Sequence, residues 1–290
     1  MSLTVVIPCY NAAATVEAAV ASARGAAQIL VVDDGSHTET ANRLDSLVAT
    51  NTYPNLELVR LPQNAGLGAA RNAGVARTTQ PWVAFLDADD VYLSHNSQSF
   101  PEAWGVFAAT QPRGHWFFHT VREWSPPASP GRVRAGDPVR QPSDLLLKRS
   151  PLAPSATVLS TSLAQKFPFQ TDRRLQGTED LDLWIRLLYA DFRPRSWSDL
   201  PWTAYRIGTG MSSALGSHAA KIRLQWARFV RNGWIQSADL AAAESELQRQ
   251  LARSYHKAGR FLKAQKAYHK AGFSLKNKLL STAAALGIRL

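Results

Sequence analysis

Three carboxylates stand close together in the segment FLDADD, residues 85–90. Asp87 and Asp89 are separated by one residue, and Asp90 follows directly. At the end of a strand, two carboxylates at this spacing can both turn toward a hard divalent cation, and Mg²⁺ or Mn²⁺ commonly bridges such carboxylates to substrate phosphates. The alternative is a strand that ends in a capped turn, where the aspartates bind the backbone. The spacing alone leaves both interpretations open.

A second acidic group lies in the segment GTEDLDLWIRL, residues 177–187. Apolar residues recur there at helical spacing, which predicts a helix over residues 179–189. Glu179, Asp180 and Asp182 would then occupy its first turn, where the helix dipole favours negative charge. That dipole is one explanation of the acidic run. The other is a carboxylate placed to accept a proton during a reaction.

Short β-branched runs alternate with helical stretches over the first 90 residues, which is typical of βαβ units with a buried parallel sheet. We predict helices over Ala12–Arg24, Thr38–Ala49 and Gly66–Arg77, and a strand over Leu56–Leu61. Polar residues follow each predicted strand, namely Asn11, Asp33 with Asp34, Asn64, and the aspartates of residues 87–90. Ligands of open parallel sheets bind outside the carboxyl ends of the strands, so these side chains are expected to line one crevice.

The composition is that of a folded protein with a substantial core: 290 residues, 45% hydrophobic and 19% charged. One cysteine, Cys9, excludes an internal disulfide framework and a cysteine-built zinc site, and it fits a reducing compartment. No stretch approaches about 18 consecutive apolar residues, and the first residues do not have the pattern of a signal peptide. We therefore expect a cytoplasmic protein.

The positive charge is concentrated in the last quarter of the chain. Residues 1–220 hold 19 Lys and Arg against 19 Asp and Glu, whereas residues 221–290 hold 14 against 3. Helical spacing dominates residues 218–275, where the segment LARSYHKAGRFLKAQKAYHKA resembles one tetratricopeptide-like hairpin with its turn at Gly259. This basic tail is either a solvated face or a surface for reversible contact with anionic membrane through residues 218–290. Nucleic acid is the least favoured partner.

Five motifs follow one another in a fixed order: VVIPCYN (5–11), VVDDGS (31–36), QNAGLGAARNAG (63–74), FLDADD (85–90) and GTEDLDLWIRL (177–187). Together they resemble the motifs of the family 2 glycosyltransferases, over roughly residues 3–215. The resemblance implies an α/β fold of the GT-A type, a Rossmann-like and mostly parallel sheet flanked by helices, here with a C-terminal helical extension. It divides the chain into a nucleotide-sugar-binding half (1–110), an acceptor-binding half (111–215) and a basic helical tail (216–290).

The activity that the resemblance implies is an inverting, metal-dependent transfer of a sugar. The donor would be a nucleotide sugar, with a UDP-sugar as first candidate, and the acceptor a hydroxyl of a glycan or a lipid-linked molecule in polysaccharide or envelope assembly. Asp87 and Asp89 match the metal motif for Mn²⁺ or Mg²⁺, and Asp87 also matches a donor contact. Asp180 matches the general base, and Glu179 orients the helix start or touches the acceptor.

The resemblance also assigns the donor contacts at the strand ends. Pro8 and Tyr10 match positions that pack against the nucleotide base, and Asp34 matches the carboxylate that accepts its imide N–H. Tyr10 could instead be a half-buried tyrosine at the rim of the fold. Asp33, beside Asp34, could hold the turn.

Three further donor contacts follow from the later motifs. Asn64 and Gly66 suit a tight loop in which the backbone approaches the donor. Arg71 matches a position near the diphosphate or the base, or else is a solvent-facing helical arginine. Arg206, in a segment running to Ser213, resembles a closing element over the diphosphate, or else forms a structural salt bridge.

The second hypothesis for the whole chain is a non-catalytic nucleotide-sugar-binding or scaffold protein that uses its basic tail for partner or membrane docking. The intact acidic motifs argue against it, because a chain without a catalytic task has no chemical need for both.

Overall fold

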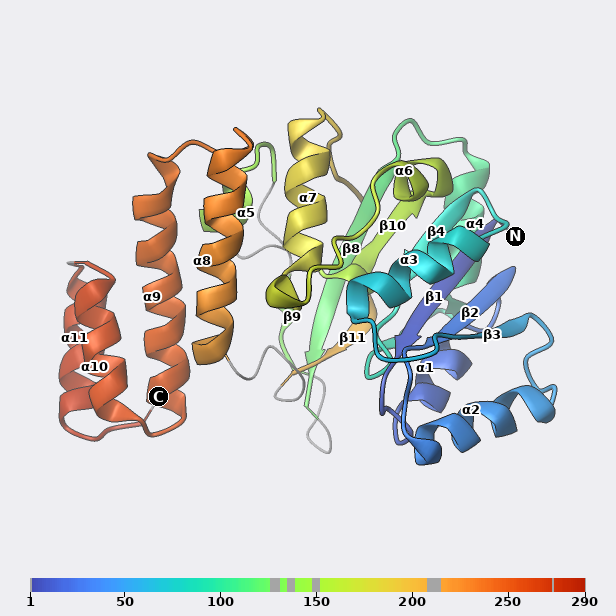
Figure 1. Cartoon of the computed structure of the whole chain (residues 1–290), viewed down its shortest axis with the longest axis horizontal. Helices are drawn as coiled ribbons and strands as arrows, with labels where there is room; N and C mark the ends of the chain where they lie inside the picture. Colours follow the sequence, from blue (N-terminus) through green and yellow to red (C-terminus); the bar gives the residue numbers. More distant parts are fainter. Residues whose placement is uncertain are drawn as a thin grey trace. The chain divides into compact units, whose positions relative to one another are not determined.

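The computed structural model describes residues 2–125, 131–134, 139–147, 152–207, 215–272 and 274–289 (Figure 1). The chain divides into two compact units. The first consists of Met1–Arg140 and Arg149–Thr209, and the second of Gln141–Lys148 and Gly210–Leu290.

The first unit is built on a mixed sheet with the strand order β3-β2-β1-β4-β10-β8-β11-β5, and β9 pairs with β8. The four strands from β3 to β4 are parallel, β10 is antiparallel to both of its neighbours, and β11 runs parallel to β8. The strands are β1 (Leu3–Cys9), β2 (Gln28–Asp33), β3 (Leu56–Arg60), β4 (Trp82–Phe85), β5 (Val91–Tyr92), β8 (Trp116–Trp124), β9 (Val133–Arg134), β10 (Thr157–Ser160) and β11 (Arg195–Arg206), with β6 (Ser94–His95) and β7 (Gln98–Ser99) as a separate pair.

Helices flank this sheet, and the alternation of side chains along β1 shows how. Leu3, Val5 and Ile7 belong to one apolar core together with residues of α1, α2 and α4. Val6 points to the opposite face and meets Gly74 of α3. The helices of this unit are α1 (Val16–Ser22), α2 (Thr38–Ala49), α3 (Leu67–Arg77), α4 (Phe100–Ala109), α6 (Thr161–Lys166) and α7 (Glu179–Tyr189), with single 3₁₀ turns at Pro154–Ala156 and Arg173–Leu175.

The α/β class and the parallel first half are confirmed, and α2 and α7 have the predicted bounds. The first helix is shorter than the predicted Ala12–Arg24, because turns precede Val16 and follow Ser22. The prediction missed α4 and β10. Strand β11 has 12 residues, and its pairing with β8 shifts register three times. Such irregular pairing leaves no regular alternation in the sequence.

The second unit is helical. Its helices are α5 (Asp144–Leu147), α8 (Leu215–Arg231), α9 (Asp239–Lys257), α10 (Phe261–Lys270) and α11 (Leu275–Ala285). The predicted hairpin is present, since α9 and α10 pack together around a turn in which Gly259 has a positive φ of 69°. Over the described residues, every helix is too short or too polar to cross a bilayer.

Two helical glycines test the packing of α3 on the sheet. A Cβ at Gly74 would overlap the side chain of Val6, whereas a Cβ at Gly105 in α4 meets nothing within 4 Å. We expect Gly74→Ala to lower the free energy of unfolding by about 1–3 kcal/mol through overpacking. Gly105→Ala should raise it by about 0.5–1 kcal/mol, because alanine restricts the unfolded chain and suits a helix. Denaturant unfolding of both variants measures the difference; equal effects would show that α3 does not pack closely on β1.

Candidate functional site

The carboxyl ends of β1 and β2 are tied together by the polar residues that follow them. The side-chain Oδ1 of Asn11 accepts a hydrogen bond from the backbone N–H of His37 at 2.8 Å, and the backbone N–H of Asn11 donates to Ser36 Oγ at 3.1 Å. Asp33 holds the same turn, because its Oδ1 accepts from the Ser36 N–H at 3.0 Å. These contacts lie at the carboxyl edge of the parallel strands, where open α/β sheets bind their ligands.

Asp34 is buried and holds the loop that leads into α3. Its carboxylate accepts hydrogen bonds from Ala65 N at 2.7 Å, Gly66 N at 2.9 Å and Asn64 Nδ2 at 3.1 Å. A carboxylate offers about four acceptor positions, so these contacts leave it roughly one more. Gly66 adopts a φ of 95°, which favours glycine at this position before the helix.

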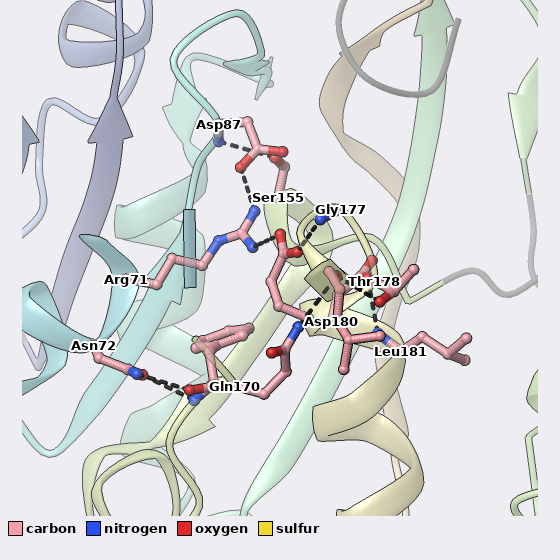
Figure 2. A network of polar contacts seen from close by, with 12 residues as sticks. Arg71, Asn72, Asp87, Ser155, Gln170, Gly177, Thr178, Asp180 and Leu181 are labelled. Carbon is pink, nitrogen blue, oxygen red and sulfur yellow. Dashed lines mark hydrogen bonds and ion pairs between the residues drawn. The ribbon is translucent and has the colours of Figure 1, made fainter. Parts of the chain in front are cut away.

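Arg71 lies one turn into α3 and is not solvent-facing: only 1% of its side chain is exposed. Nη2 donates to Asp87 Oδ1 at 2.7 Å, and Nη1 donates to Glu179 Oε1 at 3.1 Å (Figure 2). The guanidinium also lies over the ring of Phe169, at 5.2 Å from its centroid. Burial alone would lower the pKa of Arg71, but attraction to Asp87 and Glu179 outweighs it and raises the pKa. One buried cation thus joins the two acidic motifs of the sequence.

The first turn of α7 carries Glu179 and Asp180. Glu179 is buried, and besides the ion pair with Arg71 its Oε2 accepts from Gly177 N at 2.6 Å, so it fixes the helix start. Asp180 is partly exposed, and its Oδ1 accepts from Leu181 N at 2.7 Å. Desolvation, followed by the negative charge of Glu179, raises the pKa of Asp180 to about 7, although Arg71 opposes the rise. A carboxyl with a pKa near neutrality is suited to proton transfer.

The acidic segment after β4 concentrates negative charge. Asp87 and Asp89 are half-buried, and the backbone N–H of Asp87 donates to Ser155 Oγ at 3.1 Å. Asp90 is buried; burial and the nearby Asp87 raise its pKa well above the usual range, against the hydrogen bonds of Ser155 and Arg206. Among the described residues its Oδ2 has no hydrogen-bond partner.

The residues of the acidic segment fit a divalent cation whose coordination shell is completed by the substrate. In the described part of the chain, no three His, Cys, Asp or Glu side chains form a ready-made metal site. A Mg²⁺ or Mn²⁺ ion held by one or two carboxylates takes its remaining ligands from water and phosphate oxygens. Asp87 and Asp89 supply such oxygens, and the buried Oδ2 of Asp90 beside them has no hydrogen-bond partner among the described residues.

Arg206, at the end of β11, is attached to the same segment. Its N–H donates to Asp90 Oδ1 at 2.7 Å, its Nε donates to the carbonyl oxygen of Asp89 at 3.0 Å, and its guanidinium lies over Trp124. Arg206 is therefore anchored within the fold beside the acidic segment, through its backbone N–H and its guanidinium. Most of the segment leading on to Ser213, residues 208–214, lies outside the described residues.

At the carboxyl end of β1, Pro8 is buried, whereas Tyr10 just after the strand is 47% exposed. The ring of Tyr10 lies 6.4 Å from that of His37.

Two residues at the site escaped the sequence analysis. Ser155 supports Asp87, and Arg173 donates from Nη2 to Asn64 Oδ1 at 2.5 Å. Arg173 also lines a small pocket that runs from the start of α3 to Glu179; its other lining residues are Ala65, Gly66, Leu67, Gly68, Gln170, Thr171, Asp172 and Gln176. Neither residue belongs to a recognisable motif, so only the fold reveals them.

Known proteins share sequence similarity with this chain. The model named "Glycosyl transferase family 2" matches residues 4–104. The succinoglycan biosynthesis protein ExoO of Rhizobium meliloti is 38% identical over 92 residues, 30% of this chain and 25% of that protein. The pre-mycofactocin glycosyltransferase of Mycobacterium tuberculosis is 31% identical over 199 residues, 67% of this chain and 40% of that protein. The chain thus spans less than half of these relatives.

Solved structures share the fold. Staphylococcus aureus TarS 1–349, in complex with UDP-GlcNAc, superposes with a TM-score of 0.61 and 16% identity, over 99% of this chain and 88% of that one. The mannosyltransferase PcManGT of Pyrobaculum calidifontis, in complex with GDP-Man and Mn²⁺, has a TM-score of 0.60 and 18% identity, over 98% and 80%. With the family match and the ordered motifs, these comparisons show that the chain carries a family 2 glycosyltransferase domain of the GT-A fold.

Proposed function

We propose that the chain transfers a sugar, with inversion at C1, from a nucleotide sugar to a hydroxyl of a glycan or lipid-linked acceptor. The observation that carries the proposal is the Arg71 bridge. It ties Asp87 of the acidic segment to Glu179, directly beside Asp180, although these motifs lie about 90 residues apart in the sequence. An inverting transfer needs leaving-group stabilisation and a base in a fixed relation, and a buried ion pair provides such a relation.

Asp180 is the general base of this proposal. Its carboxylate takes the proton of the acceptor hydroxyl as that oxygen forms a bond to C1, and the bond between C1 and the phosphate oxygen breaks on the opposite face. The pKa of about 7 matches a base that must be ionised before the step and protonated after it. Glu179 is a positioning residue for the start of α7, because its carboxylate already accepts hydrogen bonds from Arg71 and from the Gly177 N–H.

Asp87 and Asp89 would hold the Mn²⁺ or Mg²⁺ ion, which supplies positive charge to the departing nucleoside diphosphate. The complex of PcManGT with GDP-Man and Mn²⁺ supports this part of the proposal. Asp87 shares its carboxylate with Arg71, so the same ion pair also sets the direction in which the metal motif faces.

The remaining donor contacts follow the crevice. Tyr10 offers its exposed ring to the base, Pro8 shapes the strand end beside it, and Asp34 retains one acceptor position for a base N–H. The complex of TarS with UDP-GlcNAc supports a UDP-sugar as first candidate.

Three further residues would contact the donor. Gly66 and Asn64 form the tight loop before α3, and Arg206 stands beside the acidic segment.

We also propose a class of acceptor and a location. ExoO is named for succinoglycan biosynthesis, which supports polysaccharide or envelope assembly. We assign the donor half to residues 1–110, the acceptor half to 111–215, and reversible contact with anionic membrane at the cytoplasmic face to the basic tail, 216–290.

Nucleotide binding is the first test. A ligand that binds the folded state raises its apparent stability by mass action. We expect UDP or a UDP-sugar with Mn²⁺ to raise the melting temperature, with a smaller effect when EDTA removes the metal. A panel of nucleotides and nucleotide sugars in a thermal-shift assay measures this. If none of them shifts the transition, the chain is not a nucleotide-sugar enzyme, and the scaffold hypothesis gains.

Asp180→Asn separates catalysis from folding. We expect transfer to fall by about 10²–10⁴-fold, because the proton acceptor is lost, while UDP binding persists. The raised pKa also means that stability falls as pH rises from about 4 to 7, since the unfolded carboxyl ionises first. The variant should therefore be more stable than the original protein at pH 8, by about 1–2 kcal/mol, and gain nothing near pH 3.

Turnover assays and melting curves at the two pH values measure this prediction. Asp191→Asn, at the other end of α7 with 90% of its side chain exposed, is the matched control and should change neither quantity. Loss of UDP binding in Asp180→Asn would instead make Asp180 a structural residue.

Asp89→Ala tests the metal. We expect the variant to lose the Mn²⁺-dependent part of the nucleotide-induced thermal shift, because a carboxylate ligand has been removed. Asp45→Ala removes the same charge from an exposed site on α2 and should keep the full shift. Unchanged metal dependence in Asp89→Ala would refute the assignment.

A further inference from the structure

The last helix, α11, buries small and polar residues and exposes two of its three leucines. Asn277, Ser281 and Ala284 are its buried residues. Leu275, Leu279 and Leu286 are 71%, 63% and 70% exposed, the last of them immediately after the helix. A helix packed on a globular core normally shows the reverse distribution, because burial of leucine is favourable.

The outward leucines form one stripe. Residues four apart lie on the same face of an α-helix, and eleven residues complete about three turns. Leu275, Leu279 and Leu286 therefore project within about 40° of one another around the helix axis. Ile288, just beyond the helix, and Leu262 on the neighbouring α10 are also exposed, at 55% and 77%. We call Leu275, Leu279 and Leu286 the leucine stripe.

Positive charge surrounds this stripe. Lys276 and Lys278 are exposed and lie on either side of it, at about 100° and 60° from Leu275 around the axis. The sequence from Leu247 to Leu290 contains ten Lys and Arg and no Asp or Glu. An apolar stripe with basic flanks is the pattern of a helix that lies in the interface of a membrane.

We propose that the α10–α11 face docks on an anionic membrane surface, with the leucine stripe inserted among the lipids and Lys276 and Lys278 at the headgroups. Charge complementarity selects this occupant. A second copy of the chain would bring an equally basic face against the first, which like charges oppose. Nucleic acid would use exposed aromatic rings for stacking, whereas the large exposed apolar side chains described in the second unit are all aliphatic.

The contact is shallow and reversible. Three leucines bury little apolar surface, and each basic residue near the lipid contributes a modest electrostatic attraction that salt weakens. The proposal rests on the membrane contact proposed above for the basic tail and names the face that makes it. It is independent of sugar transfer, because vesicle binding requires no nucleotide sugar.

Vesicle flotation of the intact chain tests the proposal. The vesicles contain phosphatidylcholine either alone or with about 30 mol% phosphatidylglycerol. We expect binding to the anionic vesicles and about tenfold weaker partition for the variant Leu275→Ser, Leu279→Ser, Leu286→Ser. Lys276→Gln with Lys278→Gln should also weaken it, and about threefold or more is expected from two charges.

Matched variants in the first unit control for general effects of composition. Val48→Ser, Val106→Ser and Leu200→Ser replace three apolar residues that are 43%, 65% and 50% exposed. Arg113→Gln with Lys166→Gln removes two exposed positive charges. Both control variants should bind anionic vesicles as the unmodified chain does, and circular dichroism should show that every variant is folded.

Insertion has its own readout. Cys9 is 1% exposed, so a fluorophore sensitive to polarity can be attached selectively to Leu279→Cys, and to Val106→Cys as control. Its emission should shift to the blue with anionic vesicles at position 279 and stay constant at 106. Undiminished binding by the leucine variant would overturn the proposal. So would a dimer in analytical ultracentrifugation that the leucine variant abolishes, or RNA binding without vesicle binding.

Discussion

The geometry of the candidate site depends on one buried cation, the guanidinium of Arg71. Arg71 is almost fully enclosed, and a buried guanidinium is tolerable only where anions surround it. Asp87 and Glu179 meet that requirement from two different parts of the sheet edge, at 2.7 and 3.1 Å. The requirement is mutual, because without Arg71 two carboxylates would be left in a poorly solvated site. Folding of this region therefore also fixes Asp87 of the acidic segment relative to the first turn of α7.

The same arrangement explains why Asp180 differs from its neighbours. Arg71 is already engaged by Asp87 and Glu179, so its charge only partly offsets the desolvation of Asp180 and the repulsion by Glu179. The pKa of Asp180 consequently lies near 7, where a carboxyl can both accept and hold a proton. The pKa of Asp180 thus depends on the charges of Arg71, Asp87 and Glu179 together. A substitution of Arg71 would change both the protonation and the position of Asp180.

The sequence predicted the frame of this site but not its internal bonds. Strand ends, helix α7 and the ordered motifs were readable because periodicity and strand-end polarity are local properties. The burial of Arg71 could not be predicted, because the sequence around a helical arginine is the same whether its side chain contacts solvent or two distant carboxylates. The same holds for Asp34, which binds the loop at Asn64–Gly66, and for Ser155, which supports Asp87 from a segment without a motif. Contacts between residues far apart in the chain leave no trace in one sequence.

The tail shows the opposite case, in which local pattern misleads. The hairpin predicted around Gly259 is present, and α9 and α10 bury apolar residues such as Leu251, Ala264 and Tyr268. By the same reasoning the leucines of α11 would be core residues, yet the helix packs through Asn277, Ser281 and Ala284. Two lysines beside the leucine stripe would have been poorly placed in a core, because a buried ammonium needs a partner and this region has no acidic residue. The charge pattern, read together with the apolar spacing, therefore favours an outward-facing stripe over a buried one.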